Sequence, residues 1–417
     1  MKIRAEMKAI YSNAGEFEMK SNQAVSTIAS RKNTTSIQSY STNFINNLFL
    51  KCGIRPNGKK PYDIQINNFD FYKKVLSKWS LGLGESYMDG DWDCQQLDEF
   101  MNRLLRQDLN NHVNGKALIR LYLEILRERI FNLQSKDRSF LVGELHYDAG
   151  NDLFEKMLDS NMNYSCGYWE GCNTLEQAQE NKLKMICEKL ELKEGEKILE
   201  IGCGWGGLAA YAAKNYGVSV LGITISREQQ NLAIDRCKNL PVNIELLDYR
   251  DLNGKFDKIV SVGMFEHVGL KNYSTYIDNV TRLLDDDGLF LLHTIGSDVS
   301  VNRTDPWIDR YIFPNGRIPS SVEICKAIEG KLLIEDWHNF GQDYDKTLMA
   351  WYENFIKHWP MLSPNYSNRF YRMWTYYLLG CAGFFRSRQG QLWQIVLSKR
   401  SRNQVYRSKR VGNLISI

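Results

Sequence analysis

A glycine-rich turn between a strand pattern and a helix pattern constrains the fold of this chain more than any other stretch. Residues 197–213 read Lys-Ile-Leu-Glu-Ile-Gly-Cys-Gly-Trp-Gly-Gly-Leu-Ala-Ala-Tyr-Ala-Ala. Apolar, β-favouring residues run into the glycines, and good helix formers follow them. Glycine permits positive φ angles and lets a ligand lie against bare main chain at a helix N-terminus. The stretch therefore predicts a strand, a tight ligand-binding turn and a helix.

The spacing of the glycines favours one kind of ligand. Dinucleotide-binding turns follow the pattern G-x-G-x-x-G. Here Gly202, Gly204 and Gly206 alternate with other residues, and the carboxylate of Glu200 precedes them. A carboxylate at this position repels a pyrophosphate but suits an ammonium or a sulfonium group. We interpret the turn as an S-adenosylmethionine site, although a glycine-rich turn alone is also found in dinucleotide dehydrogenases.

Strand and helix patterns alternate beyond the turn. Apolar runs at 218–223, 242–246, 256–262 and 289–292 predict strands, and helices are expected from Ser226 and over 273–284. This alternation predicts an α/β fold with a parallel, doubly wound sheet, and a final strand is expected at 392–397. Ligands of such sheets bind at the carboxyl ends of the strands, which carry Thr224, Asp248, Tyr249, Glu266, His267 and His293.

The region before the turn has a different composition. The first 40 residues are rich in polar side chains and predict a disordered or weakly ordered extension. Residues 41–145 predict a smaller, mostly helical domain, with one apolar helical face at 97–105 and a basic amphipathic helix near 118–129. The glycine-dense stretch 80–92 predicts a loop that lines a site, or a plain turn between helices.

Charge and cysteine content exclude several classes of protein. The nine cysteines include no C-x-x-C pair, so we expect neither a disulfide framework nor a metal site, and a cytoplasmic location. No run of about 20 apolar residues predicts a membrane span. The net charge is +4, but no acidic residue follows Glu353, whereas eleven cationic residues do. Such a basic end, with a tail at 401–417, predicts contact with an anionic membrane surface or with nucleic acid, or a merely solvated tail.

Several motifs together resemble the cyclopropane-fatty-acyl-phospholipid synthase family. They are Leu199-Glu-Ile-Gly-Cys-Gly-Trp-Gly-Gly207, Met264-Phe-Glu-His-Val-Gly269, Tyr311-Ile-Phe-Pro-Asn-Gly316 and Cys381-Ala-Gly-Phe-Phe385. The stretches at 82–90 and 146–148 are similar to the longer bacterial form, which has an N-terminal lipid-binding domain. The resemblance spans about residues 44–397. It implies a class I methyltransferase (Rossmann-like) domain at 146–400 with substrate-tunnel insertions, after a lipid-binding domain at 41–145.

The resemblance also implies an activity. The family transfers a methyl group from S-adenosylmethionine to a cis double bond in an unsaturated acyl chain of a membrane phospholipid, and proton loss then closes a cyclopropane ring. Aromatic faces can stabilise the carbocation between these steps without quenching it. The chain is 12% aromatic, and the candidate rings are Tyr311, Phe313, Tyr344, Trp351 and Tyr377. Packing in the core is the alternative role for each ring.

Site residues follow from the same motifs by position. The catalytic set implied is Cys166, Glu266, His293, Tyr344 and Cys381. Bound bicarbonate is the implied base, held by Cys166, Glu266, His293, Ile295 and Tyr344. The implied cofactor residues are Tyr164, Ser165, Glu200, Gly202, Gly204, Trp205, Gly206, Thr224, Gln229, Tyr249 and Arg250. The second strand ends in Thr224 instead of a carboxylate, so Thr224 and Gln229 are expected to hold the ribose. Cys381 has no base or metal implied beside it, which favours a tunnel wall over a nucleophile.

The resemblance also implies partners for the chain, and several alternative functions stay open. The family implies a homodimer that associates peripherally with the inner membrane. Alternatives are a related lipid methyltransferase that leaves a methyl or methylene branch, a headgroup N-methyltransferase, and a non-catalytic lipid- or nucleic-acid-binding protein. The Cys166, Glu266, His293 and Tyr344 set favours an enzyme. The basic end lacks the interleaved aromatic residues of single-strand binders, so no nucleic-acid partner is expected.

Overall fold

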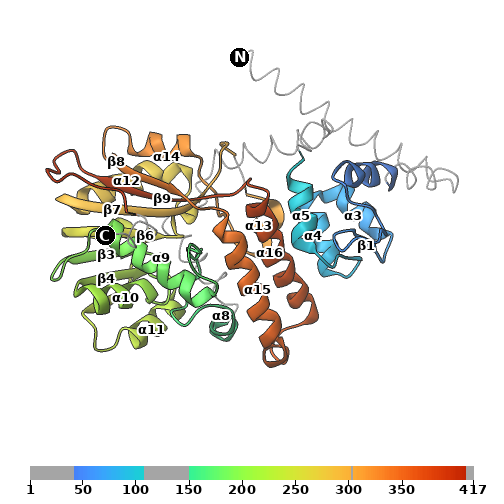
Figure 1. Cartoon of the computed structure of the whole chain (residues 1–417), viewed down its shortest axis with the longest axis horizontal. Helices are drawn as coiled ribbons and strands as arrows, with labels where there is room; N and C mark the ends of the chain where they lie inside the picture. The colour runs from blue at the N-terminus through green and yellow to red at the C-terminus, as the bar shows by residue number, and fades with distance from the viewer. Residues whose placement is uncertain (1–41, 108–149, 302–303, 410–417) are drawn as a thin grey trace, which may run out of the picture.

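The computed structural model describes residues 42–107, 150–301 and 304–409 (Figure 1). Three sequence features lie outside the described residues: the polar extension over 1–40, the basic helix near 118–129 and the motif at 146–148. The predictions made for them therefore remain predictions.

A seven-stranded sheet forms the larger part of the molecule, in the order β5-β4-β3-β6-β7-β9-β8. Strands β5, β4, β3, β6 and β7 run parallel, whereas β9 pairs antiparallel with both β7 and β8. The α/β class is thus confirmed, with an antiparallel edge in place of a wholly parallel sheet. The strands are β3 (Lys197–Ile201), β4 (Ser219–Thr224), β5 (Val242–Leu246), β6 (Phe256–Val262), β7 (Leu284–Gly296), β8 (Leu333–Asn339) and β9 (Gln391–Ser398).

Helices cover both faces of this sheet. Along β7, Leu289 and Leu291 face one apolar core, while Phe290 and Leu292 face another. The first core is covered by α9 (Leu175–Lys189), α10 (Gly207–Tyr216) and α11 (Arg227–Arg236), and the second by α12 (Tyr273–Leu283) and α14 (Ser321–Ile328). Burial on both faces explains why the strands read as continuous apolar runs.

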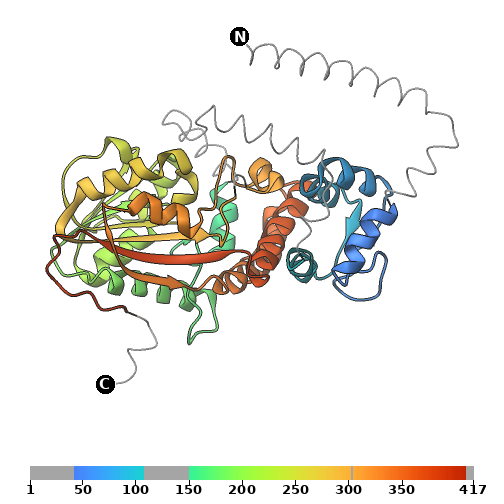
Figure 2. The ribbon, with the colours of Figure 1, turned by 90° about the horizontal axis from the view of Figure 1, so that it is seen from above.

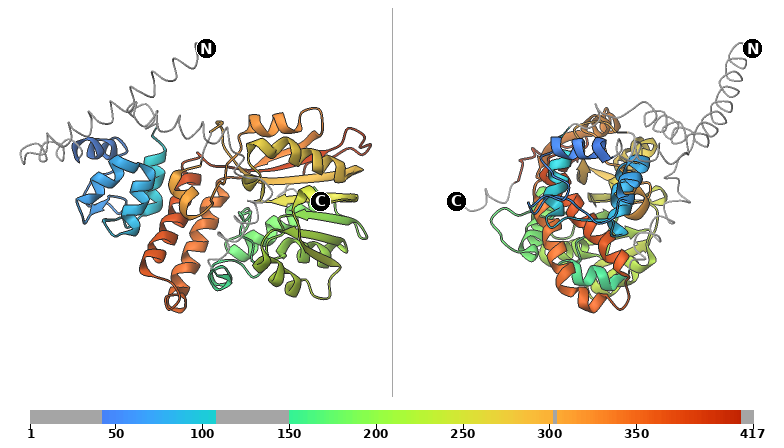
Figure 3. Two further views of the ribbon diagram at one scale, coloured as in Figure 1. Left: turned by 180° about the vertical axis from the view of Figure 1, so that it is seen from behind. Right: turned by 90° about the vertical axis from the view of Figure 1, so that its right-hand side faces the viewer.

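A second group of helices stands beside the sheet. The long helices α15 (Asp343–Leu362) and α16 (Asn368–Arg386) lie between the sheet and the N-terminal elements (Figures 1, 2 and 3). One apolar cluster contains side chains from the N-terminal elements and from the long helices, for example Phe100 and Trp374 respectively. The other elements here are a helix over 42–51, β1 (Gln65–Ile66), α3 (Asp70–Lys78), α4 (Ser80–Met88), β2 (Trp92–Asp93), α5 (Leu97–Leu105), α8 (Asn151–Met157) and α13 (Pro306–Tyr311). Among the described helices, none combines the length and the apolar character that crossing a bilayer requires.

The loop expected at 80–92 is wrong, because most of this stretch forms α4. The helix is buried over 82–88. A Cβ atom at Gly82 would collide with the main chain of Lys74, and one at Gly84 would collide with the ring of Trp307. These glycines therefore serve close helix packing.

The basic end is less available to partners than its composition predicts. Five of its cations form ion pairs within the chain, three of them on α16 with acids of the N-terminal elements. The pairs are Arg369–Asp89, Arg372–Asp93, Arg386–Asp98, Lys399–Asp286 and Arg402–Glu191. The positions of the charges can be read from the sequence, but their partners cannot. In the α16 pairs, the acidic partner lies about 280 positions earlier in the chain.

The first half of the expected basic tail also packs against the sheet domain. The Arg402 side chain is 2% exposed, and it donates to the main-chain oxygen of Asp287. Ser408 Oγ donates to Asp336 Oδ1 at 3.0 Å. Residues 401–409 are thus tied to the fold by side-chain bonds and are not a freely solvated segment.

Candidate active site

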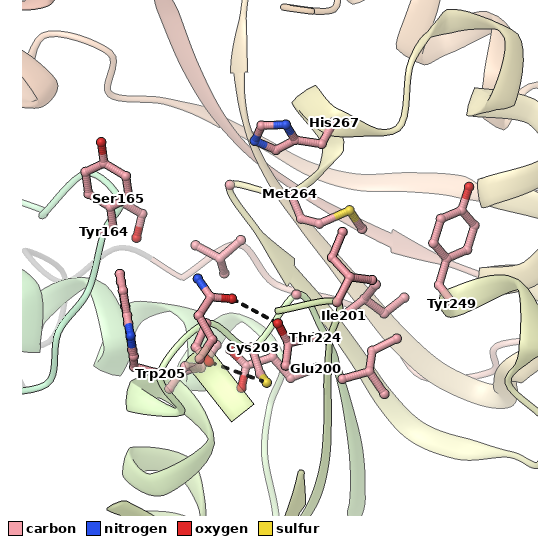
Figure 4. A pocket seen from close by; sticks show the side chains of 18 of the residues that line it. Tyr164, Ser165, Glu200, Ile201, Cys203, Trp205, Thr224, Tyr249, Met264 and His267 are labelled. Carbon is pink, nitrogen blue, oxygen red and sulfur yellow. Dashed lines mark hydrogen bonds between the residues drawn. The ribbon is translucent and has the colours of Figure 1, made fainter. Parts of the chain in front are cut away.

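A cavity of about 180 Å³ lies at the carboxyl ends of β3, β4 and β6 (Figure 4). Ten of the eleven predicted cofactor residues line it: Tyr164, Ser165, Glu200, Gly202, Gly204, Trp205, Thr224, Gln229, Tyr249 and Arg250. The strand order explains this convergence, because neighbouring parallel strands present their carboxyl ends at one edge. Their contacts with a cofactor remain a prediction.

The glycine turn has the positive φ angles that its composition predicts. Gly202 lines the cavity with a φ of 82°, and a Cβ there would come within 2.8 Å of the Met264 side chain. Gly206 has a φ of 78° and is the N-cap of α10, but it does not line the cavity. A Cβ at Gly206 would press on Ala233 and Cys237 instead. Gly206 thus shapes the turn and the packing of α11, and its contact with a cofactor remains a prediction.

Glu200 carries an unsatisfied acceptor into the cavity. Its side chain is 3% exposed, and its Oε2 atom has no hydrogen-bond partner among the described residues. Burial raises the pKa of Glu200 to about 8, although the charge of Lys182 lowers it in part. A buried carboxylate oxygen without a donor is suited to an ammonium group, which is the chemistry expected of the amino-acid end of the cofactor.

Two polar pairs frame another side of the cavity. Thr224 Oγ1 donates to Gln229 Oε1 at 2.9 Å, which commits the Thr224 hydroxyl proton and leaves the Gln229 amide hydrogens as donors (Figure 4). Asp248, also in the lining, accepts two bonds from the Arg250 guanidinium, at 2.7 Å from Nε and 2.6 Å from Nη2. Arg250 is therefore held by Asp248.

Glu266 and His293 each present an unpartnered polar atom beside this edge of the sheet. Glu266 Oε1 accepts the main-chain N–H of Ile295 at 2.6 Å, whereas Glu266 Oε2 and His293 Nε2 have no partner among the described residues. Gln394 Nε2 lies 3.3 Å from His293 Nδ1. Because an amide nitrogen can only donate, His293 Nδ1 accepts and the imidazole carries its proton on Nε2. Burial raises the pKa of Glu266 to about 7.

The predicted base-holding residues are brought together by packing. Cys166, Ile295 and Tyr344 pack in one apolar cluster with Phe340, and the His293 ring lies 5.8 Å from the Phe340 ring. The Ile295 N–H donates to the Glu266 carboxylate, so this N–H is not available to bind a free anion. None of the five predicted residues lines the cofactor cavity itself.

Aromatic rings continue from the cavity toward α16. Tyr164 in the cavity wall shares a hydrogen bond of 2.7 Å between its hydroxyl and that of Tyr377. Trp351 lies 5.2 Å from the Tyr164 ring, and Phe313 lies 5.9 Å from the Tyr377 ring. The Tyr311 hydroxyl donates to Glu85 on α4. A role of the Tyr311 ring in stabilising a cation remains a prediction.

Comparison with known proteins identifies the family. The family profile described as "Mycolic acid cyclopropane synthetase" matches residues 134–395. The chain is 58% identical over 354 residues to "Cyclopropane-fatty-acyl-phospholipid synthase" of Escherichia coli strain K12, covering 85% of this chain and 92% of that protein. The chain belongs to the cyclopropane-fatty-acyl-phospholipid synthase family. It is therefore an S-adenosylmethionine-dependent methyltransferase.

Solved structures agree with the class I methyltransferase fold of this synthase family. The cyclopropane synthase MmaA2 from Mycobacterium tuberculosis is 28% identical and aligns with a TM-score of 0.60 over 64% of this chain and all of that chain. The mycolic acid cyclopropane synthase CmaA1, complexed with SAH and CTAB, is 30% identical, with a TM-score of 0.58 over 62% of this chain and 98% of that chain.

Cys381, a residue of the synthase motif at 381–385, lies on α16. It packs at the edge of the same apolar cluster as Tyr377 and Phe313. Burial raises the pKa of its thiol to about 12. The thiolate is the nucleophilic form of cysteine, so this environment favours the wall of a substrate site over a nucleophile.

The cavity residues of this synthase-family chain that the predicted set lacks include two basic side chains, His267 and Lys182. Burial lowers the pKa of His267 to about 4, so its imidazole is neutral. His267 follows Glu266 directly, so its place in the same motif was a usable signal. Lys182 lies on α9, and a sequence pattern alone predicts that such a lysine lies at the surface and reaches water.

Proposed function

We propose that this synthase-family chain transfers a methylene unit from S-adenosylmethionine to the cis double bond of an unsaturated acyl chain in a membrane phospholipid, leaving a cyclopropane ring. The observation that carries the proposal is the junction at Tyr164, where a cavity lined by the predicted cofactor residues meets an aromatic cluster. The 58% identity to the Escherichia coli synthase supports the choice of substrate.

The chemistry requires a dry, aromatic site. The sulfonium of the cofactor supplies the methyl group, and the alkene carbon takes it as the carbon–sulfur bond breaks toward sulfur. The remaining alkene carbon is then a carbocation. Rings such as Phe313, Trp351 and Tyr377 can stabilise this cation through their π faces, while their bulk excludes the water that would quench it.

The second step needs a base, and the buried polar groups fit bicarbonate. Within the described part of the chain, the Nε2–H of His293 is an unpartnered donor for an anion, and Glu266 Oε2 is an unpartnered acceptor for a hydroxyl. Bound there, bicarbonate would supply the base that takes a proton from the added methyl group. The Ile295 N–H fixes the Glu266 carboxylate, and the Gln394 amide fixes the His293 tautomer.

We further propose that residues 41–145 bind lipid, that the chain acts as a homodimer, and that it associates peripherally with the inner membrane from the cytoplasm. Within the described part of the basic end, four exposed cations are available for an anionic surface: Lys357, Arg388, Arg400 and Arg407. Each cation near anionic headgroups contributes about 1 kcal/mol of attraction. Binding to anionic vesicles should therefore weaken as salt is raised, and binding that is independent of salt would contradict the membrane proposal.

Incubation of the chain with vesicles of unsaturated phospholipid and S-adenosylmethionine tests the proposed reaction. Gas chromatography–mass spectrometry should show fatty acids one CH2 heavier that resist hydrogenation. Products that take up hydrogen would indicate a methylene branch, and unchanged fatty acids with a heavier headgroup would indicate N-methylation. Glu266→Gln should lower the rate by at least about 100-fold, the usual contribution of a positioned acid–base group. The exposed residue Glu329 provides the matched control, Glu329→Gln.

A further inference from the structure

The Lys182 ammonium is buried in the wall of the cofactor cavity. It lies on α9 and is 1% exposed. Its Nζ donates to Asn163 Oδ1 at 3.1 Å and to Ser165 Oγ at 3.0 Å. Both acceptors line the cavity with it. A buried lysine keeps its charge only where acceptors and opposite charges surround it. The charge of Lys182 therefore depends on the loop that supplies Asn163 and Ser165.

The loop before α9 is fixed by a chain of bonds that ends at Lys182. The Asp159 carboxylate accepts from the main-chain N and the Nδ2 of Asn163, both at 2.8 Å. These bonds point Asn163 Oδ1 toward the lysine. On the preceding turn of α9, Gln179 Nε2 donates to the main-chain oxygen of Ser165 at 2.8 Å. The main chain at Ser165 is therefore held independently of the lysine, and Lys182 acts on the hydroxyl.

Lys182 determines whether the Ser165 hydroxyl acts as a donor or as an acceptor toward a ligand. An ammonium has donors and no acceptor, so Ser165 Oγ accepts from Lys182 and keeps its own proton for another partner. No described residue takes that proton. Ser165 therefore offers the cavity a donor whose direction is set by Lys182. On β3, Glu200 Oε2 offers an acceptor that has no partner in the described ranges.

A donor and an acceptor of this kind complement a zwitterionic amino acid. The amino-acid end of S-adenosylmethionine carries a carboxylate, which needs donors, and an ammonium, which needs an acceptor. We propose that Lys182 is a positioning residue that orients the Ser165 hydroxyl toward the cofactor carboxylate, while Glu200 accepts from the cofactor ammonium. This inference rests on S-adenosylmethionine being the ligand of the cavity.

Calorimetric binding of two ligands tests the proposal in the full chain. S-adenosylhomocysteine has the amino-acid end, whereas 5′-methylthioadenosine shares the adenosine and sulfur but lacks it. Lys182→Met should raise the Kd of S-adenosylhomocysteine about tenfold or more, the loss expected for a hydrogen bond to a charged group. The Kd of methylthioadenosine should change less than about twofold.

The controls separate positioning from folding. Lys189 is a second fully buried lysine on α9 and does not line the cavity, so Lys189→Met should leave both Kd values unchanged. Ser165→Ala should reproduce the ligand selectivity of Lys182→Met, and the double variant should lose no more than either single one. Equal weakening of both ligands, or additive losses, would overturn the proposal. Failure of the unaltered chain to bind either ligand would instead refute the cofactor assignment.

Discussion

The hydroxyl groups of Tyr164 and Tyr377 lie 2.7 Å apart, although 213 positions separate the two residues. Tyr164 belongs to the wall of the cofactor cavity, and Tyr377 lies at the centre of α16. Their bond joins the place where the methyl donor is expected to the helix that carries much of the aromatic cluster. This contact is where the reacting groups of the proposed reaction would meet.

Tyr377→Phe should lower kcat about tenfold, because Tyr164 loses the bond that sets its ring at this junction and small misplacements are costly there. The Kd for S-adenosylhomocysteine should change less than about twofold, since the cavity wall is otherwise intact. Steady-state kinetics and calorimetry measure the two quantities. Tyr371→Phe is the matched control, because the Tyr371 hydroxyl makes no hydrogen bond among the described residues although its ring stacks on Phe355. A comparable loss in both variants would contradict the role of the Tyr164–Tyr377 bond.

The stability of the chain should depend on pH through Glu266. Its pKa is about 7 in the folded chain and 4.5 in the reference state, with burial as the main cause. The folded state therefore binds more protons between these values, and stability falls as pH rises through this window. Glu266→Gln removes this dependence, so its unfolding free energy relative to the unaltered chain should rise by up to about 3 kcal/mol from below pH 5 to above pH 7.

Urea unfolding at several pH values measures this difference. Glu329→Gln replaces an exposed carboxylate and should show a constant offset from the unaltered chain. If the Glu266→Gln and unaltered curves run parallel from pH 5 to pH 8, the carboxyl is not held in the buried environment described above.

Cys381→Ser should keep at least about one third of the activity, because a thiol with a pKa near 12 supplies almost no thiolate at neutral pH. The product assay by mass spectrometry measures this directly. A loss of about 100-fold with unchanged cofactor binding would restore Cys381 as a chemical participant.

Arg386→Met should lower the unfolding free energy by about 2 kcal/mol, the range for hydrogen bonds to charged groups. Arg386 joins three helices, because Nη1 lies 2.6 Å from Asp98 on α5 while Nε and Nη2 each lie 2.9 Å from Asp345 on α15. The exposed Arg388 is the control, and Arg388→Met should cost less than about 0.5 kcal/mol. Similar losses in both variants would show that charge alone, and not this network, is responsible.

The order of elements was predictable wherever local pattern and tertiary burial agree. The glycine turn, the strands β3 to β7 and the helix α9 all carry apolar runs or periodicity that match their final environment. The local pattern does not predict strand β8, because it is an edge strand with an exposed Leu333 and a polar centre. A loop is expected over 80–92 because helix propensity penalises glycine, whereas Gly82 and Gly84 are required by neighbours that a local pattern does not contain.

Local sequence patterns suffice for the α/β class, for the strand ends near the cavity and for the motifs that resemble a known family. The tertiary structure decided which of those groups meet: it gave Glu266 the Ile295 amide as a partner, placed Tyr311 against Glu85, and paired α16 cations with distant acids. It also made Lys182 a buried donor. Periodicity reports which face of an element is apolar, but the partner of a buried charge depends on contacts between segments that lie far apart in the chain.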